Sequence, residues 1–515
     1  MASTEAATAE ETGKVNLPTL TAMVVGSMVG SGVFLLPRRF GTETGVLGAI
    51  IAWCIAGTGM LMLAFCFQRL AVRKPTLDAG IFAYAKAGFG DYVGFNSAFG
   101  FWASACAGNT SYWVLIMATT SALFPALGDG STVLAVVLSS IGLWLFFFLI
   151  SRGVQQAAII NRIATVAKIV PIVVFIVIAL VMLDGGYFSA NFWGGNGIKV
   201  GSLWEQVKGT MLITVFVFLG IEGASMYSRF AKKRADVGRA TVLGFLSVLG
   251  VFALVTLVSY GALPQGQLAS IDQPSMASVL QSLVGEWGSV FIRIGVILSV
   301  LGAYLAWTLM AAEILYVPAR SSDMPRFLGR SNAAGAPVPA LMFATGLVQI
   351  LLILLLFVDD GLDFMLDLTA TLSLLPYLLA AAYMLKLTLT RETYDPGDPA
   401  QAASGTRRGI DMAIAIVAVI YTVFLVWAAG VDKLLLSCIL YALGTILYVV
   451  ARREQRLPIF RRAEALLFGV FVVGAIGGIV YLSTGSEDIH EHPDQERHSY
   501  YVDDPLTAHG TGDHQ

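Results

Sequence analysis

The chain has few charged residues and no excess of basic ones, and these shortages exclude two broad classes of protein. Charged residues make up only 13% of the 515 residues, against about 25% in a typical soluble domain, while hydrophobic residues make up 57%. This composition excludes a soluble multi-domain enzyme. With 32 Lys and Arg residues against 34 Asp and Glu residues, the formal charge is −2, so the chain lacks the basic field that holds nucleic acid.

Cysteine and histidine are scarce, and their placement does not suit a disulfide scaffold or a metal centre. The four cysteines stand inside apolar runs without a CxxC pair or a Cys/His metal spacing: Cys54, Cys66, Cys106 and Cys438. All five histidines follow Leu482, in an acidic tail too poor in apolar residues to fold alone: His490, His492, His498, His509 and His514. We favour a solvated tail over metal binding by these histidines, and we predict no metal and no cofactor.

Thirteen stretches are long and apolar enough to cross a bilayer as helices. The hydrocarbon core requires about 20 mostly apolar residues in helical form, because lipid offers no partner for a free backbone N–H or C=O. The expected spans are 17–37, 45–70, 91–124, 132–150, 159–183, 203–229, 240–263, 288–316, 339–358, 363–387, 410–428, 431–450 and 463–482. We expect residues 1–16 to form a disordered cytoplasmic lead-in, because they carry acids and no basic region of a signal peptide.

Lys and Arg residues collect in alternate connections between these spans. With the N-terminus inside, the inner connections hold 22 of the 32 basic residues. The outer connections hold only Arg38, Arg39, Lys199 and Lys433. Because cytoplasmic loops carry the excess of positive charge, we predict a multi-pass protein of the cell membrane with a cytoplasmic N-terminus. Thirteen spans place the C-terminal tail outside, whereas an even number would place it inside.

The first span contains a glycine-rich segment that favours an interrupted helix. Its sequence is LPTLTAMVVGSMVGSGVFLLP, in which Gly26, Gly30 and Gly32 stand beside two serines. Each glycine costs a helix up to about 1 kcal/mol relative to alanine and lets another group approach the backbone. An unwound segment is one interpretation. The alternative is a helix-packing face, because Gly26 and Gly30 have GxxxG spacing.

The sixth span carries a second such segment, which shifts the balance towards two interruptions. In MLITVFVFLGIEGASMYSRF, Gly220 and Gly223 flank Glu222 within an apolar run. The second break follows the first after five helices, and this odd number makes spans one to five and six to ten opposite in orientation. Interrupted helices at matching positions predict a substrate site near the bilayer midplane, where freed N–H groups hold a carboxylate.

Glu222 is costly at this depth, since a charged side chain disfavours insertion by roughly 2.5–3.5 kcal/mol. We therefore expect it to be neutral or paired. A functional role is favoured because Glu222 lies within the second break. The alternative is a buried ion pair with Lys168 in the fifth span or Arg293 in the eighth.

Three motifs at matching spans resemble the amino acid/polyamine/organocation superfamily: GSMVGSGVFLLP, GIEGAS and WTLMAAE. Residues 73–109 and 320–341 match as well, so the resemblance runs from about residue 17 to 450. The closest likeness is to basic amino acid antiporters, the arginine/ornithine exchangers and related lysine permeases. The resemblance implies an all-α integral membrane protein with a five-plus-five inverted-repeat (LeuT-like) core and interrupted helices 1 and 6. We thus expect a transport core at 17–387, a cytoplasmic loop at 388–409, accessory helices at 410–482 and a disordered acidic tail at 483–515.

The resemblance also implies a substrate site. The unwound part of span one receives the substrate α-carboxylate at Met28, Gly30, Ser31 and Gly32. Carbonyls at the span-six break accept the α-ammonium group: Phe216, Leu219 and Gly220. The distal cation meets span three at Ser104, Ala105 and Asn109, for which an ordinary interhelical hydrogen bond is the alternative at Asn109. Trp307 lines the site, and Thr369 supplies a hydroxyl.

Four further residues are implied in gating or coupling. Tyr377 matches a gating tyrosine, whereas Phe101 replaces the tyrosine that relatives have before the span-three tryptophan. Phe216 departs from the arginine/agmatine exchangers, which have tryptophan there, so a cation–π contact at this position is weakened. Lys168 stands where sodium-coupled relatives bind the ion and argues against sodium dependence. Glu222 is the candidate proton carrier.

The resulting hypothesis is an electroneutral exchanger of cationic amino acids, such as arginine for ornithine, working by alternating access. The alternative is a proton-coupled symporter or uniporter for lysine or another amino acid. The spans show no repeated polar filter of a channel. They also hold no histidine, HExxH or GxSxG, so we predict that the protein is not an enzyme. A receptor role and a homodimer stay open.

Overall fold

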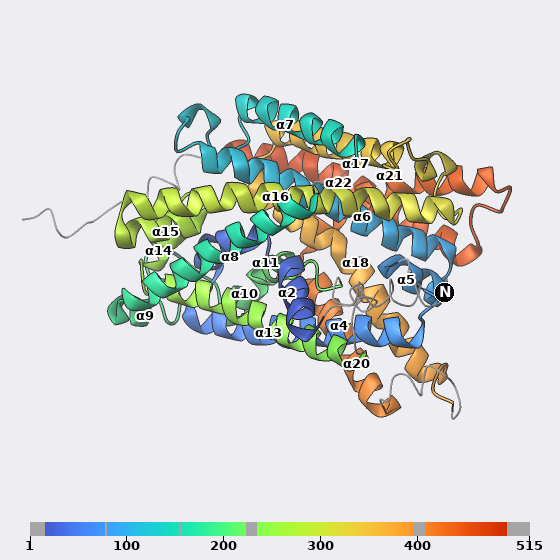
Figure 1. The fold of residues 1–515 in the computed structure, drawn as a ribbon, viewed down its shortest axis with the longest axis horizontal. Coiled ribbons are helices and arrows are strands. Elements are labelled where there is room, and N and C mark those ends of the chain that lie inside the picture. The colour runs from blue at the N-terminus through green and yellow to red at the C-terminus, as the bar shows by residue number, and fades with distance from the viewer. Residues whose placement is uncertain (1–15, 78–79, 154–156, 223–233, 396–406, 492–515) are drawn as a thin grey trace, which may run out of the picture.

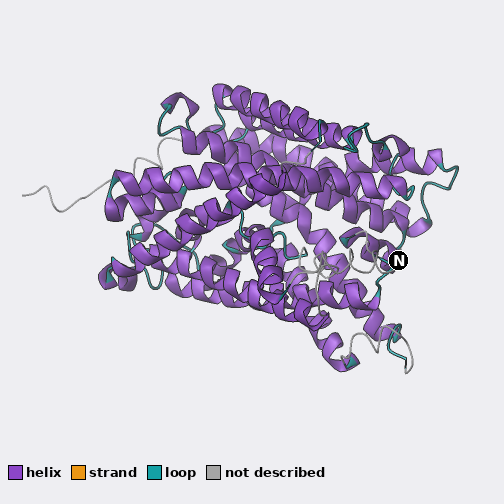
Figure 2. Ribbon diagram, viewed as in Figure 1, coloured by secondary structure: helices purple, strands orange, loops and turns teal. Residues whose placement is uncertain are grey.

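The computed structural model describes residues 16–77, 80–153, 157–222, 234–395 and 407–491, except for the side chains of 157–166, 234–237 and 484–491. Within these residues every regular element is a helix (Figure 2). The first half comprises α2 (Leu17–Met28), η1 (Gly32–Leu35), α3 (Leu36–Glu43), α4 (Val46–Arg73), α5 (Ile81–Phe89), α6 (Asp91–Thr120), η2 (Pro125–Leu127), α7 (Val133–Ser151), α8 (Ala157–Val181), α9 (Gly185–Ala190), α10 (Leu203–Gly209) and α11 (Met211–Val217). The second half comprises α13 (Arg234–Ser259), α14 (Gln265–Ser270), α15 (Ser275–Val284), α16 (Glu286–Arg320), η4 (Arg326–Gly329), α17 (Val338–Leu354), η5 (Leu355–Phe357), α18 (Gly361–Thr390), α20 (Arg408–Ala428), α21 (Val431–Glu454) and α22 (Arg462–Glu491).

Each of the thirteen expected spans contains helix, while the short helices α5, α9, α14 and α15 lie in the connections between spans. In the described part of the chain, nine helices are long and apolar enough to cross a membrane, and α2 with the segment Gly32–Glu43 forms one further span bent by 50°. Helix α6 has spanning length but is less apolar, because nearly all of its residues are buried and polar ones among them pack inside the protein. The protein is therefore a multi-pass helical membrane protein.

Several span ends differ from the sequence prediction. Helix α22 continues to Glu491, nine residues beyond the expected end of the last span, and residues 492–515 of the predicted tail lie outside the described residues. Helix α18 runs on to Thr390. In the sixth span the helix stops at Val217, since the chain turns at the glycine-rich segment.

The centre of the fold is helix α6, which packs against α5, α16, α17, α18 and α21. The short helices α2 and α11 are drawn in the middle of the molecule, between α13 and α16 (Figure 1). Helix α2 packs against α13, and α11 packs against α4, α18 and η1. The broken ends of these helices thus meet residues of the buried helix α6.

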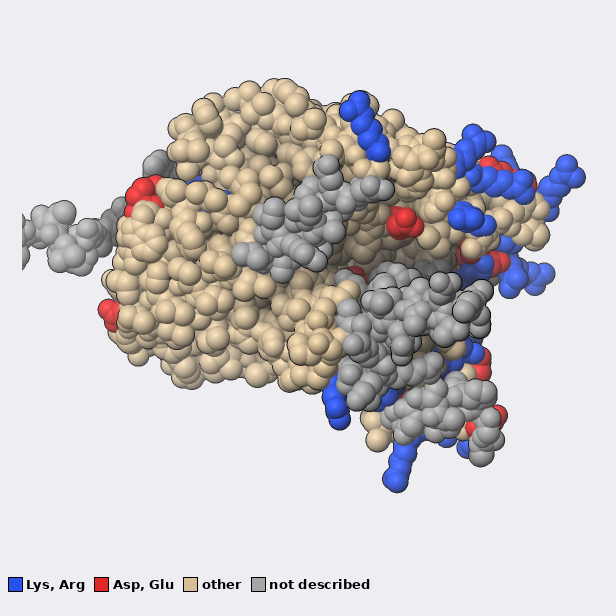
Figure 3. All heavy atoms as spheres, in the orientation of Figure 1, with Lys and Arg blue, Asp and Glu red and all other residues tan. Residues whose placement is uncertain are grey.

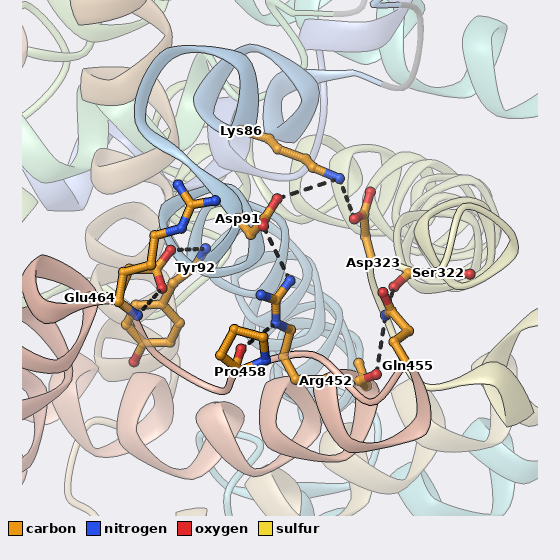
Figure 4. A network of polar contacts seen from close by, with 11 residues as sticks. Lys86, Asp91, Tyr92, Ser322, Asp323, Arg452, Gln455, Pro458 and Glu464 are labelled. Carbon is orange, nitrogen blue, oxygen red and sulfur yellow. Dashed lines mark hydrogen bonds and ion pairs between the residues drawn. The ribbon is translucent and has the colours of Figure 1, made fainter.

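Charged residues are segregated at the ends of the helices. In Figure 3 most of the visible Lys and Arg side chains gather at the right-hand end, while the belt to the left is almost entirely uncharged. At this end Lys86 pairs with Asp323 and lies 3.8 Å from Asp91, and Arg452 lies 3.2 Å from Asp91 (Figure 4). This network joins the start of α6 to the connection after α16 and to the end of α21.

Candidate functional site

Both predicted interruptions are present. Helix α2 ends at Met28, because Val29 has an extended backbone (φ −74°, ψ 99°), and η1 begins only at Gly32. Helix α11 ends at Val217 and is followed by turns in which Gly220 has φ 102°, a conformation that L side chains rarely adopt. The interpretation of the glycine-rich segments as breaks is therefore confirmed, and unbroken packing helices are excluded.

The two breaks touch each other through their glycines. A Cβ atom on Gly220 would lie 2.3 Å from the carbonyl oxygen of Ser27, at the end of α2. A Cβ atom on Gly32 would lie 2.6 Å from the Val217 side chain and 3.0 Å from the Phe216 ring. Real Cβ atoms do not come this close to other groups, so only glycine permits the approach.

A small cavity lies at the junction of these breaks with helix α6. Nine predicted site residues line it: Met28, Gly30, Gly32, Ser104, Ala105, Phe216, Leu219, Trp307 and Thr369. Three predicted residues, Ser31, Asn109 and Gly220, do not line it. The lining also includes five residues that sequence reasoning missed: Ser27, Val33, Gly108, Tyr112 and Val217.

Tyr112 is the most informative of the missed residues. It follows Ser104 and Gly108 at intervals of four, the spacing that places residues on one helix face. A Cβ atom on Gly30 would lie 3.7 Å from the Tyr112 hydroxyl oxygen, so this hydroxyl reaches the first break. The helical spacing from Ser104 was therefore a usable sequence signal.

The wall of the cavity opposite the breaks is held by contacts between α6, α16 and α18. The Ser104 hydroxyl donates to the Thr369 carbonyl over 2.7 Å, and the Thr369 hydroxyl donates to the Met365 carbonyl over 2.6 Å. The Phe101 and Trp307 rings lie 6.4 Å apart at an interplanar angle of 55°. The predicted hydroxyl and the two predicted aromatic residues thus belong to one packed wall.

Asn109 lies one residue round the helix from the cavity face. Its Nδ2 donates to the Thr308 hydroxyl over 3.1 Å, which is the interhelical hydrogen bond expected as the alternative. Its Oδ1 is buried without a hydrogen-bond partner among the described residues. Asn109 therefore combines a structural contact with an unused acceptor.

Backbone donors remain unused at the first break. Within the described residues, no hydrogen bond uses the N–H groups of Gly30, Ser31 or Gly32. The Ser31 side chain is 1% exposed and its hydroxyl oxygen makes no hydrogen bond there. Buried backbone donors are nearly always paired, so this segment is prepared to bind an acceptor.

The two charged residues at the breaks do not pair with each other. Lys168, on α8, donates to the carbonyl oxygens of Gly26 over 3.1 Å and Val29 over 2.8 Å. Glu222 accepts from the Gly220 N–H over 3.2 Å and from the Tyr377 hydroxyl over 2.9 Å. Arg293 donates to Ser289 and to the Thr119 carbonyl. Among the described residues, no ion pair joins Glu222 to Lys168 or Arg293, and both cations bond to other groups.

The sequence as a whole places this site in a known family. Residues 15–451 match the amino acid permease family. The chain belongs to this family. It is 46% identical to the arginine/ornithine antiporter of Pseudomonas aeruginosa, over 91% of this chain and 97% of the relative.

Two further relatives of this permease have other names. The L-lysine transport protein of Corynebacterium glutamicum is 38% identical over 92% of this chain and 96% of the relative. The arginine/agmatine antiporter of Chlamydia abortus is 36% identical over 85% of this chain and 90% of the relative. The resemblance to the superfamily and the all-α transporter fold with interrupted helices are therefore confirmed.

Proposed function

We propose that this permease is a secondary transporter that exchanges cationic amino acids across the cell membrane by alternating access, with arginine for ornithine as its pair. The observation that carries the proposal is the buried cavity at two touching helix breaks, one of which has unused N–H donors. Relatives that cover nearly the whole chain are named arginine/ornithine and arginine/agmatine antiporters. The permease is not an enzyme in this proposal.

The substrate carboxylate binds at Met28, Gly30, Ser31 and Gly32, where the N–H groups of the last three are free to donate. The α-ammonium group faces the second break, and its acceptors are the carbonyls of Phe216, Leu219 and Gly220. The distal cation extends along α6 towards Ser104, Ala105 and the unused Oδ1 of Asn109. Trp307 and Thr369 complete the cavity wall.

Gating and coupling fall to the residues around the breaks. Phe101 packs against Trp307, which lines the cavity, and neither carries a hydroxyl that could bond the substrate. Tyr377 and Lys168 fix the two breaks through hydrogen bonds to Glu222 and to the end of α2. Alternating access is then a rocking of α2, α4, α11 and α13 against the remaining helices.

Counterflow in proteoliposomes tests this function. Vesicles that contain the permease and ornithine should take up labelled arginine rapidly, whereas empty vesicles should take it up slowly. A panel of arginine, ornithine, lysine, histidine and agmatine inside the vesicles ranks the exchange partners. Equal uptake into empty and loaded vesicles would show that obligate exchange is wrong.

The second candidate function is proton-coupled symport or uniport of lysine. Two observations favour it: the relative named an L-lysine transport protein, and the buried carboxylate of Glu222 at the second break. Uptake of labelled lysine into empty vesicles that responds to a pH gradient would support it. Loss of that response in Glu222→Gln would identify the proton carrier.

The N-terminus is cytoplasmic in this proposal, since the connections on that side of the spans hold 22 of the 32 Lys and Arg residues. A single cysteine introduced at Lys14 in a cysteine-free variant should react with a membrane-impermeant maleimide only after cells are lysed, whereas one introduced at Lys199 should react in intact cells.

The possible homodimer stays a prediction.

A further inference from the structure

A second cleft opens at the end of the molecule opposite the Lys- and Arg-rich end. It encloses about 880 Å³, part of it open to solvent. Its walls come from α3, the segments that follow α6, the connection between α14 and α15, and the start of α18. In the proposed orientation all of these segments lie on the outer side of the membrane, so the cleft faces the medium.

The charges of this outer cleft suit a cation that also carries a carboxylate. Four acidic residues, Asp129, Asp272, Asp360 and Asp363, line it with a single basic residue, Arg38. Asp363 pairs with Arg39 over 3.3 Å, and Asp360 lies 4.0 Å from Arg38. Asp272 has no ion-pair partner among the described residues. The lining thus keeps a net negative charge that attracts cationic solutes.

A buried amide supplies the observation that points to a ligand. Gln273 lines the outer cleft although its side chain is only 7% exposed. Its Oε1 accepts from the Ser275 N–H over 2.8 Å, which fixes the amide, while its Nε2 has no hydrogen-bond partner among the described residues. A buried donor left unpaired is costly, commonly by about 1–3 kcal/mol. A ligand with an acceptor group would remove this cost.

The outer cleft is built directly on the half-helix beyond the first break. The Ser275 hydroxyl donates to the Phe34 carbonyl over 3.3 Å and accepts from the Arg38 N–H over 3.2 Å. Ser275 follows Gln273 by two residues, so the cleft wall is bonded to η1 and α3. An amino acid held in the cleft would lie just outside the segment that binds substrate in the proposed function.

We propose that the outer cleft is a second, weaker binding site for cationic amino acids. The substrate carboxylate binds between Gln273 Nε2 and Arg38, and the cationic groups face Asp272, Asp129 and Asp360. This site rests on the proposed function, because it concentrates the same substrates at the outer mouth of the same path. Its occupant is recognised by both a carboxylate and a positive charge.

Equilibrium dialysis of the purified full-length permease with labelled arginine, and separately with labelled agmatine, tests the proposal. Agmatine is arginine without its carboxylate. The native permease should bind arginine in two classes, one tight and one weak. Trp307→Ala should remove the tight class only, since Trp307 lines the central cavity and not the outer cleft.

Two variants separate the two halves of the ligand. Asp272→Asn should weaken binding in the weak class roughly fivefold for arginine and agmatine alike. This is the scale of one ion pair near a surface. Gln273→Glu keeps an acceptor for the Ser275 N–H but replaces the free Nε2 donor with a carboxylate oxygen. It should therefore weaken the binding of arginine without weakening the binding of agmatine. The matched control is Asp359→Asn, which removes one charge from an exposed residue next to Asp360 that does not line the cleft.

The outcomes are distinct. A single class of bound arginine in the native permease, or an equal effect of Asp359→Asn and Asp272→Asn, would overturn the second site. An equal effect of Gln273→Glu on arginine and agmatine would overturn the carboxylate contact. A weak class without a tight one would support the outer cleft and contradict the proposed function, so the two can fail separately.

Discussion

The two helix breaks are satisfied by side chains of opposite kinds, a lysine at the first and a glutamate at the second. At the first, the Lys168 ammonium group donates to the carbonyls of Gly26 and Val29, which the end of α2 leaves free. At the second, the Glu222 carboxylate accepts from the freed N–H of Gly220 and from the Tyr377 hydroxyl. The chain therefore supplies a donor where carbonyls are exposed and an acceptor where an N–H group is exposed.

In the proposed function, this difference accommodates a zwitterion. Lys168 satisfies carbonyls at the first break but leaves the N–H groups of Gly30, Ser31 and Gly32 unused. An incoming carboxylate finds donors there. Glu222 uses an N–H group at the second break, and in the proposed function an incoming ammonium group is left with carbonyl acceptors there. In this proposal, the two ends of an amino acid backbone therefore bind at different breaks.

The largest effect is expected from closing the contact between the breaks. Gly220→Ala forces a Cβ atom to within 2.3 Å of the Ser27 carbonyl at φ 102°, a backbone strain of roughly 1–3 kcal/mol before the clash is counted. We expect arginine–ornithine exchange to be lost. Gly26→Ala is the control, because no atom lies within 4 Å of its Cβ position. If the Gly220→Ala variant exchanged substrates at the same rate as the Gly26→Ala control, the close contact between the two breaks would be contradicted.

Removing the cation of the first break should have the next largest effect. Lys168→Met leaves two carbonyls at the end of α2 without their donor, at about 1–3 kcal/mol for each buried unsatisfied group. We expect arginine exchange to fall at least about tenfold and the melting temperature to drop. The exposed Lys199→Met serves as the control. Native exchange in Lys168→Met would show that this cation does not hold the break.

The smallest effect is expected at the second break, where Glu222 keeps another donor. Tyr377→Phe removes one hydrogen bond to the carboxylate, worth about 1.5–3 kcal/mol when charged groups are involved, and leaves the Gly220 contact. We expect a several-fold fall in exchange rate. Tyr448→Phe is matched, since that buried hydroxyl has no hydrogen-bond partner among the described residues. Equal behaviour of the two variants would refute a role for the Tyr377 hydroxyl.

The sequence predicted the positions of both breaks because glycine has a local conformational effect that does not depend on distant contacts. It also predicted most residues of the cavity, through the resemblance to the superfamily. The hydrogen-bond partners of the two charged residues at the breaks were harder to predict than the breaks themselves. Lys168 and Glu222 suggested an ion pair from their charges, but each meets backbone groups whose exposure depends on where the helices end.

The loops were the least predictable part. The outer cleft depends on Asp272 and Gln273, which stand in a connection between two short helices. Their proximity to Arg38 and Asp360 follows from the packing of four separate segments, and no periodic pattern in the sequence encodes it. Asn109 is a further example, since the sequence did not show that its Nδ2 donates to Thr308 while its Oδ1 is left without a partner among the described residues.

Helix α6 is buried along almost its whole length, and its Ser104 side is bonded to α18. A helix packed on every side has no room to shift, because interiors are as dense as crystals. The cavity therefore has one rigid wall and one deformable wall made of the broken helices. Substitutions on the rigid wall should alter which amino acid fits, whereas substitutions in the deformable wall should alter how fast each cycle proceeds. Preference and turnover could then diverge independently among relatives of this permease.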